Sequence, residues 1–220
     1  MSEDFEVKMR IMGAAAERFT RFGFSKVTMD ELAESLGMSK KTLYQHFTNK
    51  QDILSAMVDS AMQKCDVHVG ALLKDGQMDF VDKLTKMFSF LATQYASMNP
   101  EFIDDMRKHA PEIWKKIDEY RHVRIREQFT ELVREGIEKG MFRSDVDQHL
   151  VLLVYLTAVE HLINPTALAE IPYTASQVFD AITKVLFEGM LTDAGRAKFS
   201  IQSTLNVATD QSAYQHSVSK

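Results

Sequence analysis

The chain has 220 residues, of which 45% are hydrophobic and 26% charged, enough to bury a full core, and its formal net charge of −5 disfavours general affinity for nucleic acid. The longest apolar run, residues 150–156, is too short for the roughly 20 residues that span a bilayer, and four Pro with nine Gly favour long helices. Because Cys65 is the only cysteine and the N-terminus does not resemble a signal peptide, we expect a cytoplasmic protein without intramolecular disulfides or membrane association.

The charge is unevenly distributed along the chain. Residues 36–50 contain three lysines and no acid, whereas the chain beyond residue 50 has more acidic than basic residues. A basic N-terminal surface on an acidic body is typical of a protein that presents one end to phosphate groups.

The first predicted helix covers residues 5–22. Ile11, Ala15, Phe19 and Phe22 recur at helical spacing and are expected to form its inner face. Gly23 follows directly, at the position where a helix commonly ends in a left-handed conformation.

The second predicted helix is short and begins after Thr28. Glu31 lies three residues after Thr28, the spacing of a capping box, and Val27 with Leu32 occupies the positions of a hydrophobic staple. Gly37 then permits a tight turn.

A third short helix is predicted from Ser39, its N-cap, to about Phe47, with Leu43 and Phe47 facing inward. Its remaining side chains would face outward or lie at the helix edge: Lys40, Lys41, Thr42, Tyr44, Gln45 and His46. Two short helices joined by such a turn, the second polar and basic on its outside, indicate a helix-turn-helix whose second helix enters the major groove. The alternative is a helical hairpin with solvated polar residues.

This segment resembles the TetR family of bacterial transcriptional regulators. The residues that carry the resemblance are Ala14, Ala15, residues 19–24 and residues 28–52, including Leu36, Gly37, Ser39, the stretch 43–47 and Lys50. The resemblance implies an all-α fold, with an N-terminal three-helix DNA-binding head over residues 1–49 and a helical ligand-binding and dimerisation body over residues 50–199. It also implies that two copies bind a palindromic operator in double-stranded DNA.

The resemblance assigns roles to individual residues of the head. Lys40, Lys41, Thr42, Tyr44 and Gln45 would face bases or the DNA backbone. Thr28, Ser39, His46 and Lys50 would mainly hold phosphates. Neither set reveals the operator sequence.

The body is predicted as consecutive amphipathic helices that end near residues 75, 99 and 139, with Pro111 at the start of the longest. Two further helices, 147–163 and 176–191, would form the dimer, as the resemblance implies, because the first is apolar on nearly every side. The expected dimer residues are Leu152, Tyr155, Leu156, Val159, Phe179, Ile182, Leu186 and Met190. Core packing within one chain is the alternative. Residues 200–220 lose the apolar periodicity and are expected to form a flexible or loosely packed tail.

A pocket for a small hydrophobic or aromatic ligand is a further implication of the resemblance. The expected lining residues are Phe88, Tyr95, Met106, Trp114 and Tyr120, and ordinary core packing is the alternative for each of them.

We expect no metal, no cofactor and no enzymatic activity. Asp145, Asp147 and His149 are interpreted as a helix start rather than a metal site, and Cys65 as a buried, inert thiol. No nucleophile motif, Gly-rich phosphate loop or clustered carboxylate pair stands out in the sequence.

The sequence therefore predicts a homodimeric, sequence-specific repressor that a small ligand releases from its operator. The alternatives are a constitutive DNA-binding protein or activator without a ligand switch, and an all-helical interaction module.

Overall fold

The computed structural model describes residues 3–97 and 99–199, and within them every regular element is helical apart from one isolated bridge between Phe142 and Leu191. The helices, in chain order, are α1 (Glu3–Phe22), α2 (Met29–Ser35), α3 (Lys40–His46), α4 (Lys50–Lys74), α5 (Phe80–Ala96), α6 (Pro100–His109), α7 (Pro111–Glu138), α8 (Gln148–Leu162), α9 (Pro165–Ala169) and α10 (Ala175–Met190). Residues 193–199 are also helical. The all-α prediction is confirmed, whereas the expected tail, 200–220, lies outside the described residues.

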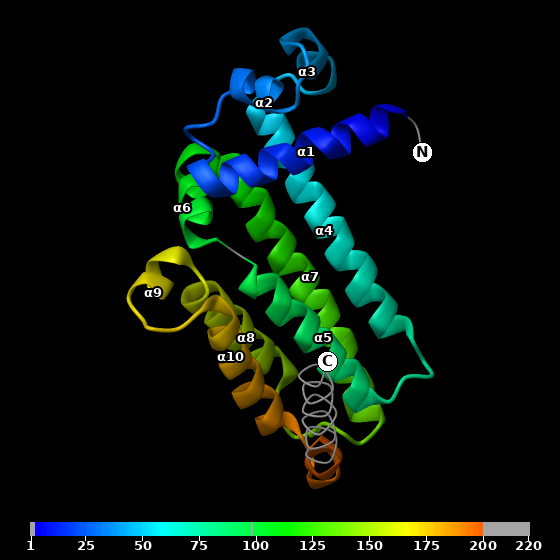
Figure 1. The fold of residues 1–220 in the computed structure, drawn as a ribbon. Helices are drawn as coiled ribbons and strands as arrows, with labels where there is room; N and C mark the ends of the chain where they lie inside the picture. Colours follow the sequence, from blue (N-terminus) through cyan, green and yellow to red (C-terminus); the bar gives the residue numbers. More distant parts are fainter. Residues whose placement is uncertain (1–2, 98, 200–220) are drawn as a thin grey trace, which may run out of the picture.

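The helices form a small head on an elongated body, as Figure 1 shows. The head comprises α1, α2 and α3, and α4 extends from it along the body beside α7. In the body, α10 packs against α5 and α8. None of the described helices is both long and apolar enough to cross a bilayer.

Local side-chain caps explain where many of these helices begin. In each of α4, α5, α6, α8, α9 and α10, the residue before the helix accepts a hydrogen bond from a backbone N–H group of the first turn. The capping residues are Asn49, Asp79, Asn99, Asp147, Asn164 and Thr174. Asp147 thus has the helix-start role that the sequence predicts.

The core of the head differs from the prediction at one aromatic residue. Ile11, Ala15 and Phe19 are fully buried, but Phe22 is 45% exposed. The Phe24 ring takes the inner position, because the chain turns at Gly23 and brings Phe24 edge-on to Phe19, with ring centroids 5.1 Å apart. The periodicity of α1 could not show this replacement, since Phe24 lies beyond the helix.

The head core does not end at the boundary between residues 49 and 50. Ile53 and Leu54 of α4, Met106 of α6 and Ile113 of α7 belong to the same buried cluster as the side chains of α1, α2 and α3. The head is therefore packed directly onto α6 and onto the first turns of α4 and α7, which continue into the body.

The body core centres on an aromatic cluster around Phe187 of α10. Its ring centroid lies 4.6 Å from that of Phe88, 5.9 Å from Phe129, 5.8 Å from Phe142 and 6.3 Å from Tyr155. These rings come from α5, α7, the loop after α7, and α8, so burial of Phe187 ties four segments of the body together.

A buried ion pair links α5 to α7. The ammonium group of Lys83, whose side chain is 1% exposed, lies 2.7 Å from Glu135 Oε2 and also donates to the backbone carbonyl of Leu73 at 3.1 Å. Lys139 reaches the other carboxylate oxygen of Glu135 at 2.7 Å. Burial acts to raise the pKa of Glu135, but hydrogen bonds from Lys139 and Lys83 outweigh it, and the pKa is lowered.

Most of the residues expected at a dimer interface lie inside the protomer instead. Six of the eight are at most 8% exposed and belong to the body core: Leu152, Tyr155, Val159, Phe179, Ile182 and Met190. Leu156 and Leu186 are half-buried against the same core. The prediction selected the wrong side of α8 and α10, because a helix with apolar residues on nearly all sides gives no periodic signal for its inner face.

The exposed apolar side chains of α8 lie on the opposite side of the helix. Leu150, Leu153 and Val154 are 61%, 60% and 53% exposed, and Val185 of α10 is 72% exposed. We call these four residues the α8–α10 apolar face. Large apolar side chains are usually buried, whereas these four are exposed on the surface of the single chain.

Candidate DNA-binding surface and ligand cavity

The start of α2 is fixed by the predicted capping box. Thr28 Oγ1 accepts a hydrogen bond from the Glu31 backbone N–H at 3.2 Å, and Glu31 Oε2 accepts one from the Thr28 backbone N–H at 2.8 Å. Val27 and Leu32 are both buried, as expected of a hydrophobic staple.

The turn between α2 and α3 is held by backbone and cap hydrogen bonds. Gly37 has a φ of +61°, a conformation that favours glycine, and the Met38 backbone N–H donates to the Ala33 carbonyl at 3.0 Å. Ser39 Oγ then accepts from the Thr42 backbone N–H at 3.0 Å and caps α3. The predicted helix-turn-helix is confirmed by this geometry.

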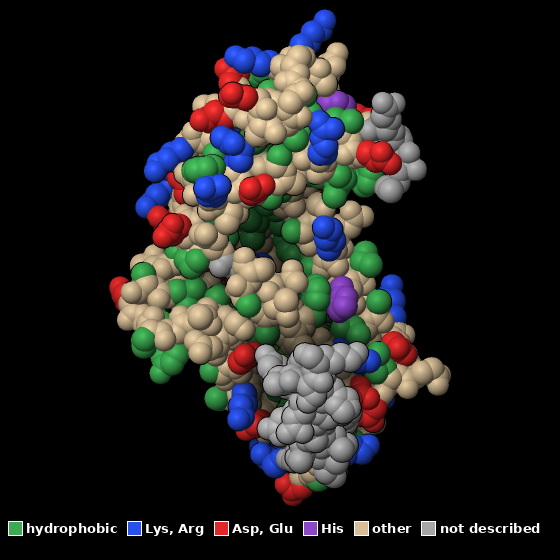
Figure 2. All heavy atoms as spheres, in the orientation of Figure 1, with side chains coloured by type: hydrophobic (Ala, Val, Ile, Leu, Met, Phe, Trp, Pro, Cys, Tyr) green, Lys and Arg blue, Asp and Glu red, His purple; other side chains and the backbone are tan. Residues whose placement is uncertain are grey.

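Helix α3 buries Leu43 and leaves its polar side chains outside. Lys40, Lys41, Tyr44 and Gln45 are exposed, and the helix contains no acidic residue. On the face drawn in Figure 2, Lys and Arg side chains project from the top of the head, where Figure 1 places α3. This surface combines cationic donors for phosphate with an amide and a hydroxyl that can reach base edges.

The two lysines at the start of α3 differ in their surroundings. Lys40 forms an exposed ion pair with Asp30 of α2 at 2.5 Å, whereas Lys41 forms no ion pair within the described part of the chain. Exposed pairs contribute roughly 0–1 kcal/mol, so a phosphate group can replace Asp30 at Lys40 at little cost.

Lys50 contradicts the expectation that it holds phosphates. Its Nζ donates to the backbone carbonyls of Phe24 at 2.9 Å, Ser25 at 2.9 Å and Val27 at 3.1 Å, and it lies 4.7 Å from the Phe24 ring centroid. Burial lowers its pKa. All three donors of the ammonium group are used inside the head, so Lys50 links the first turn of α4 to the segment between α1 and α2.

The other residues expected to hold phosphates also have partners within the head. His46 Nδ1 lies 2.9 Å from Asp4 Oδ1 of α1, and the hydroxyl of Ser39 lies 2.8 Å from that of Thr42. The Thr28 hydroxyl lies 2.9 Å from Glu31 Oε2. These three residues therefore form contacts that stabilise the head itself, and their contacts with DNA phosphates stay a prediction.

The body contains an apolar cavity of about 340 Å³ lined by α4, α5, α7, α8 and α10. This volume lies at the lower end of the range of roughly 300–1,000 Å³ that is usual for small-molecule sites. Phe88, Tyr95 and Tyr120 line the cavity, as the sequence predicts. The lining also includes Met62, Leu91, Ile117, Phe129, Phe179 and Phe187, which the prediction missed because they come from separate helices.

Met106 and Trp114 are not in this cavity. Met106 is 2% exposed and belongs to the head core. Trp114 packs against that same core and lines a much smaller cavity of about 40 Å³ between α7 and α8. Both precede Ile117, the first residue of α7 that lines the cavity of about 340 Å³.

The tyrosine hydroxyls at the cavity differ in whether they form hydrogen bonds within the protein. The Tyr120 hydroxyl lies 3.0 Å from the Met62 carbonyl oxygen and 2.9 Å from Asp66 Oδ1. By contrast, the hydroxyls of Tyr95 and Tyr155 have no hydrogen-bond partner among the described residues. Neither hydroxyl is one of the fully buried polar atoms that lack a partner in the described chain, which are Arg18 Nε and Thr183 Oγ1, so neither is a buried group left unpaired.

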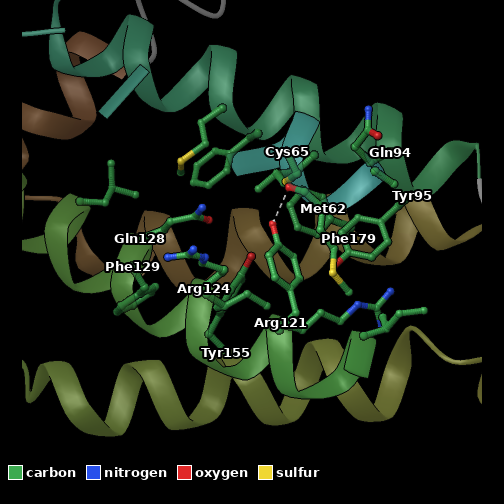
Figure 3. A pocket seen from close by; sticks show the side chains of 18 of the residues that line it. Met62, Cys65, Gln94, Tyr95, Arg121, Arg124, Gln128, Phe129, Tyr155 and Phe179 are labelled. Carbon is green, nitrogen blue, oxygen red and sulfur yellow. Dashed lines mark hydrogen bonds between the residues drawn. The ribbon is translucent and has the colours of Figure 1, made fainter. Parts of the chain in front are cut away.

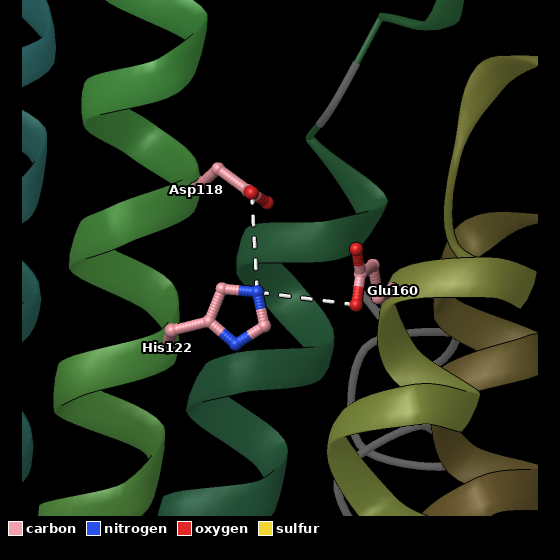
Figure 4. A group of neighbouring side chains, drawn as sticks. All are labelled: Asp118, His122 and Glu160. Atoms are coloured by element: carbon pink, nitrogen blue, oxygen red, sulfur yellow. Dashed lines mark ion pairs between the residues drawn. The ribbon is translucent and has the colours of Figure 1, made fainter.

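A second group of polar side chains lies between α7 and α8. His122 Nε2 is 3.9 Å from Asp118 Oδ2 and 3.9 Å from Glu160 Oε2, as Figure 4 shows. The three ligand atoms lie within 4.8 Å of one another. All three side chains are at least 40% exposed, and Arg121 lines the same small cavity, so we interpret the group as a solvated electrostatic contact between the two helices.

The chain matches a known family at the head and known regulators over much of its length. The family described as "Bacterial regulatory proteins, tetR family" matches residues 11–57. The uncharacterized HTH-type transcriptional regulator YvaF of Bacillus subtilis (strain 168) is 22% identical over 187 residues, which are 84% of this chain and 95% of that protein. The HTH-type transcriptional repressor KstR2 of Mycolicibacterium smegmatis is 26% identical over 145 residues, 64% of this chain and 70% of that protein.

Solved structures share the fold over most of the chain. The transcriptional regulator FadR from Bacillus subtilis, in complex with stearoyl-CoA, superposes with a TM-score of 0.61 at 20% identity. The match covers 83% of this chain and 98% of that one, so the likeness includes both head and body.

Proposed function

Because this chain belongs to the tetR family of bacterial regulatory proteins, which bind DNA and regulate transcription, we propose that it is a homodimeric repressor released from a palindromic operator by a small ligand. The observation that carries the proposal is the surface of α3. Four polar side chains stand outside the head on a helix that has no acidic residue and whose buried side fixes its orientation.

The chemistry of α3 is suited to a major groove. Lys40 and Lys41 supply charge to the DNA backbone or to guanine, and the Gln45 amide can form two hydrogen bonds with adenine. Tyr44 is 49% exposed and offers a hydroxyl at the edge of the helix. We therefore assign base reading to Gln45 and backbone attraction to the two lysines.

The α8–α10 apolar face supports dimerisation. Leu150, Leu153 and Val154 form one stripe along α8, and Val185 is an exposed apolar residue of α10, the helix that packs against α8. A second copy of the same face would cover these side chains symmetrically, as an isologous interface requires. A dimer built in this way presents two α3 helices to two half-sites.

The route from cavity to head passes through α4 and α7. In α4, Ile53 and Leu54 belong to the head core, and Val58 and Met62 line the cavity one to two turns later. In α7, Ile113 belongs to the head core and Ile117 to the cavity lining. A ligand that favours one arrangement of these helices also favours one position of the head, and a dimer with the wrong head separation binds the operator weakly.

The DNA part of the proposal is tested by charge removal on α3. In a mobility-shift assay on a duplex selected from random oligonucleotides, Lys41→Ala should weaken binding and lower the salt slope by about 0.9 for one lost phosphate contact. Lys86→Ala, an exposed lysine on α5, is the matched control and should leave both unchanged. Equal behaviour of the two variants would contradict the assignment of α3 to DNA.

The ligand part is tested separately on the same duplex. A small molecule that releases the protein from the duplex and also raises its melting temperature would support control of DNA binding by a ligand. Binding to DNA that such a molecule leaves unchanged would instead identify a constitutive DNA-binding protein or an activator.

A further inference from the structure

The apolar cavity lined by α4, α5, α7, α8 and α10 carries positive charge without a matching acid. Arg121 and Arg124 of α7 line it, and among the described residues no Asp or Glu does. Arg124 is already neutralised, because its guanidinium lies 2.7 Å from Glu127 Oε2 and 3.3 Å from Asp66 Oδ1. The charge at this site therefore comes chiefly from Arg121.

Arg121 has no carboxylate within ion-pair distance in the described part of the chain. Its guanidinium carbon lies 5.7 Å from the Trp114 ring, a contact that orients the group without neutralising it. Asp118 and Glu160 line the adjacent small cavity with Arg121, yet neither forms an ion pair with it. A half-buried guanidinium next to an apolar cavity favours an anion more strongly than an exposed one does.

Two phenolic side chains, Tyr95 and Tyr155, line the same cavity as Arg121. Burial raises the pKa of Tyr95, and the positive charge of Arg121 acts in the opposite direction. Burial also raises the pKa of Tyr155, with Tyr95 as a second cause, so both phenols stay protonated near neutral pH. Each hydroxyl therefore has a hydrogen to donate and no acceptor in the described protein.

Figure 3 shows Tyr155, Tyr95 and Arg121 among the residues around one cavity, each from a different helix. We propose that this cavity binds an apolar molecule with one carboxylate group, which forms an ion pair with Arg121 and accepts hydrogen bonds from Tyr95 and Tyr155. The apolar body of the ligand would lie against Phe88, Phe179 and Leu91. This inference rests on the proposed function, because it names the ligand class of the cavity that would control the repressor.

The test compares carboxylic acids with neutral molecules of the same shape, without DNA. Decanoate and decanol form one pair, and 2-naphthoate and 2-naphthalenemethanol the other, with binding measured by calorimetry on the full chain. At least one acid should bind more tightly than its alcohol by at least about tenfold, as expected for charge-assisted hydrogen bonds.

Variants locate the effect. Arg121→Gln should remove the preference for the acid, whereas Arg126→Gln should keep it, because Arg126 is an exposed arginine of α7 that does not line the cavity. Tyr155→Phe removes only a hydroxyl that lacks a protein partner, so it should lower acid binding by about tenfold without lowering the melting temperature.

Equal binding of acid and alcohol, failure of every acid to bind, or a preference that survives Arg121→Gln would overturn the inference. Release from DNA is measured afterwards with the acid that binds best. An acid that binds through Arg121 but does not release the operator would leave the ligand class intact and contradict the proposed switch.

Discussion

At the scale of single residues, Lys50 offers a sharp prediction. Lys50→Met removes three hydrogen bonds to backbone carbonyls, and we expect it to lower the free energy of unfolding by about 1–3 kcal/mol. The salt dependence of DNA binding by the folded variant should remain that of the unchanged protein, because Lys50 supplies no phosphate contact. Urea unfolding and mobility shifts at several salt concentrations measure the two effects.

Lys41→Ala is the matched control for this prediction. Lys41 is exposed and forms no ion pair in the described part of the chain, so its removal should leave the urea midpoint in place and weaken DNA binding. A stable Lys50→Met protein with a reduced salt slope would show that Lys50 contacts phosphates after all.

These two lysines also show what the sequence could and could not predict at the site. Thr28, Ser39 and Leu43 take the predicted roles because caps and helical spacing depend on residues only three or four positions away. The partners of Lys50 lie 23 to 26 residues earlier in the chain, and no local pattern indicates them. Lys41 is exposed, as predicted, because no acidic side chain in the described part of the head forms an ion pair with it.

At the scale of elements, the buried ion pair between Lys83 of α5 and Glu135 of α7 should make the free energy of unfolding depend on pH. The folded pKa of Glu135 is lowered below its ordinary value of 4.5, so its contribution is fully present above pH 4.5 and is lost as the pH falls through the folded value. At pH 7, Glu135→Gln should lower the free energy of unfolding by about 3–5 kcal/mol, because Lys83 then remains buried without its counter-charge.

The difference in the free energy of unfolding between Glu135→Gln and the unchanged protein should become smaller as the pH drops below 4.5. Urea unfolding midpoints of both proteins from pH 7 to pH 3 measure this difference. Glu119→Gln, which breaks an exposed pair with Lys115, should change the midpoint little at any pH. A gap that stays constant with pH would show that Glu135 acts through packing rather than charge.

The limits of helices were predicted correctly where they depend on capping and helix-breaking residues close by in the sequence. The expected limits of α1, α8 and α10 lie within two residues of the observed ones, and Pro111 begins α7. The loop between α8 and α10 contains an unpredicted helix, α9, because five residues are too few to show periodicity. The inner faces of α8 and α10 depend on packing against α5 and α7, so sequence alone assigned them wrongly.

At the scale of the whole molecule, the α8–α10 apolar face should set the oligomeric state. Leu153→Asp combined with Val154→Asp places charges at the centre of that face, and we expect the dimer to dissociate without loss of helical content, because both side chains are exposed in the protomer. Sedimentation velocity and far-UV circular dichroism provide the two readouts.

Val67→Asp is the control, since Val67 of α4 is 67% exposed but lies outside the α8–α10 apolar face. It should sediment like the unchanged protein. A double variant that remains dimeric would place the interface elsewhere on the surface.

The central claim is that a symmetric pair of chains presents two α3 helices to one duplex, and selection from random-sequence DNA tests it most directly. The account predicts enrichment of an inverted repeat that binds two protomers, with half-site centres on one face of the helix, separated by about 10 base pairs or a multiple of that spacing. Failure to enrich any sequence, or enrichment of a single half-site bound by one protomer, would contradict it.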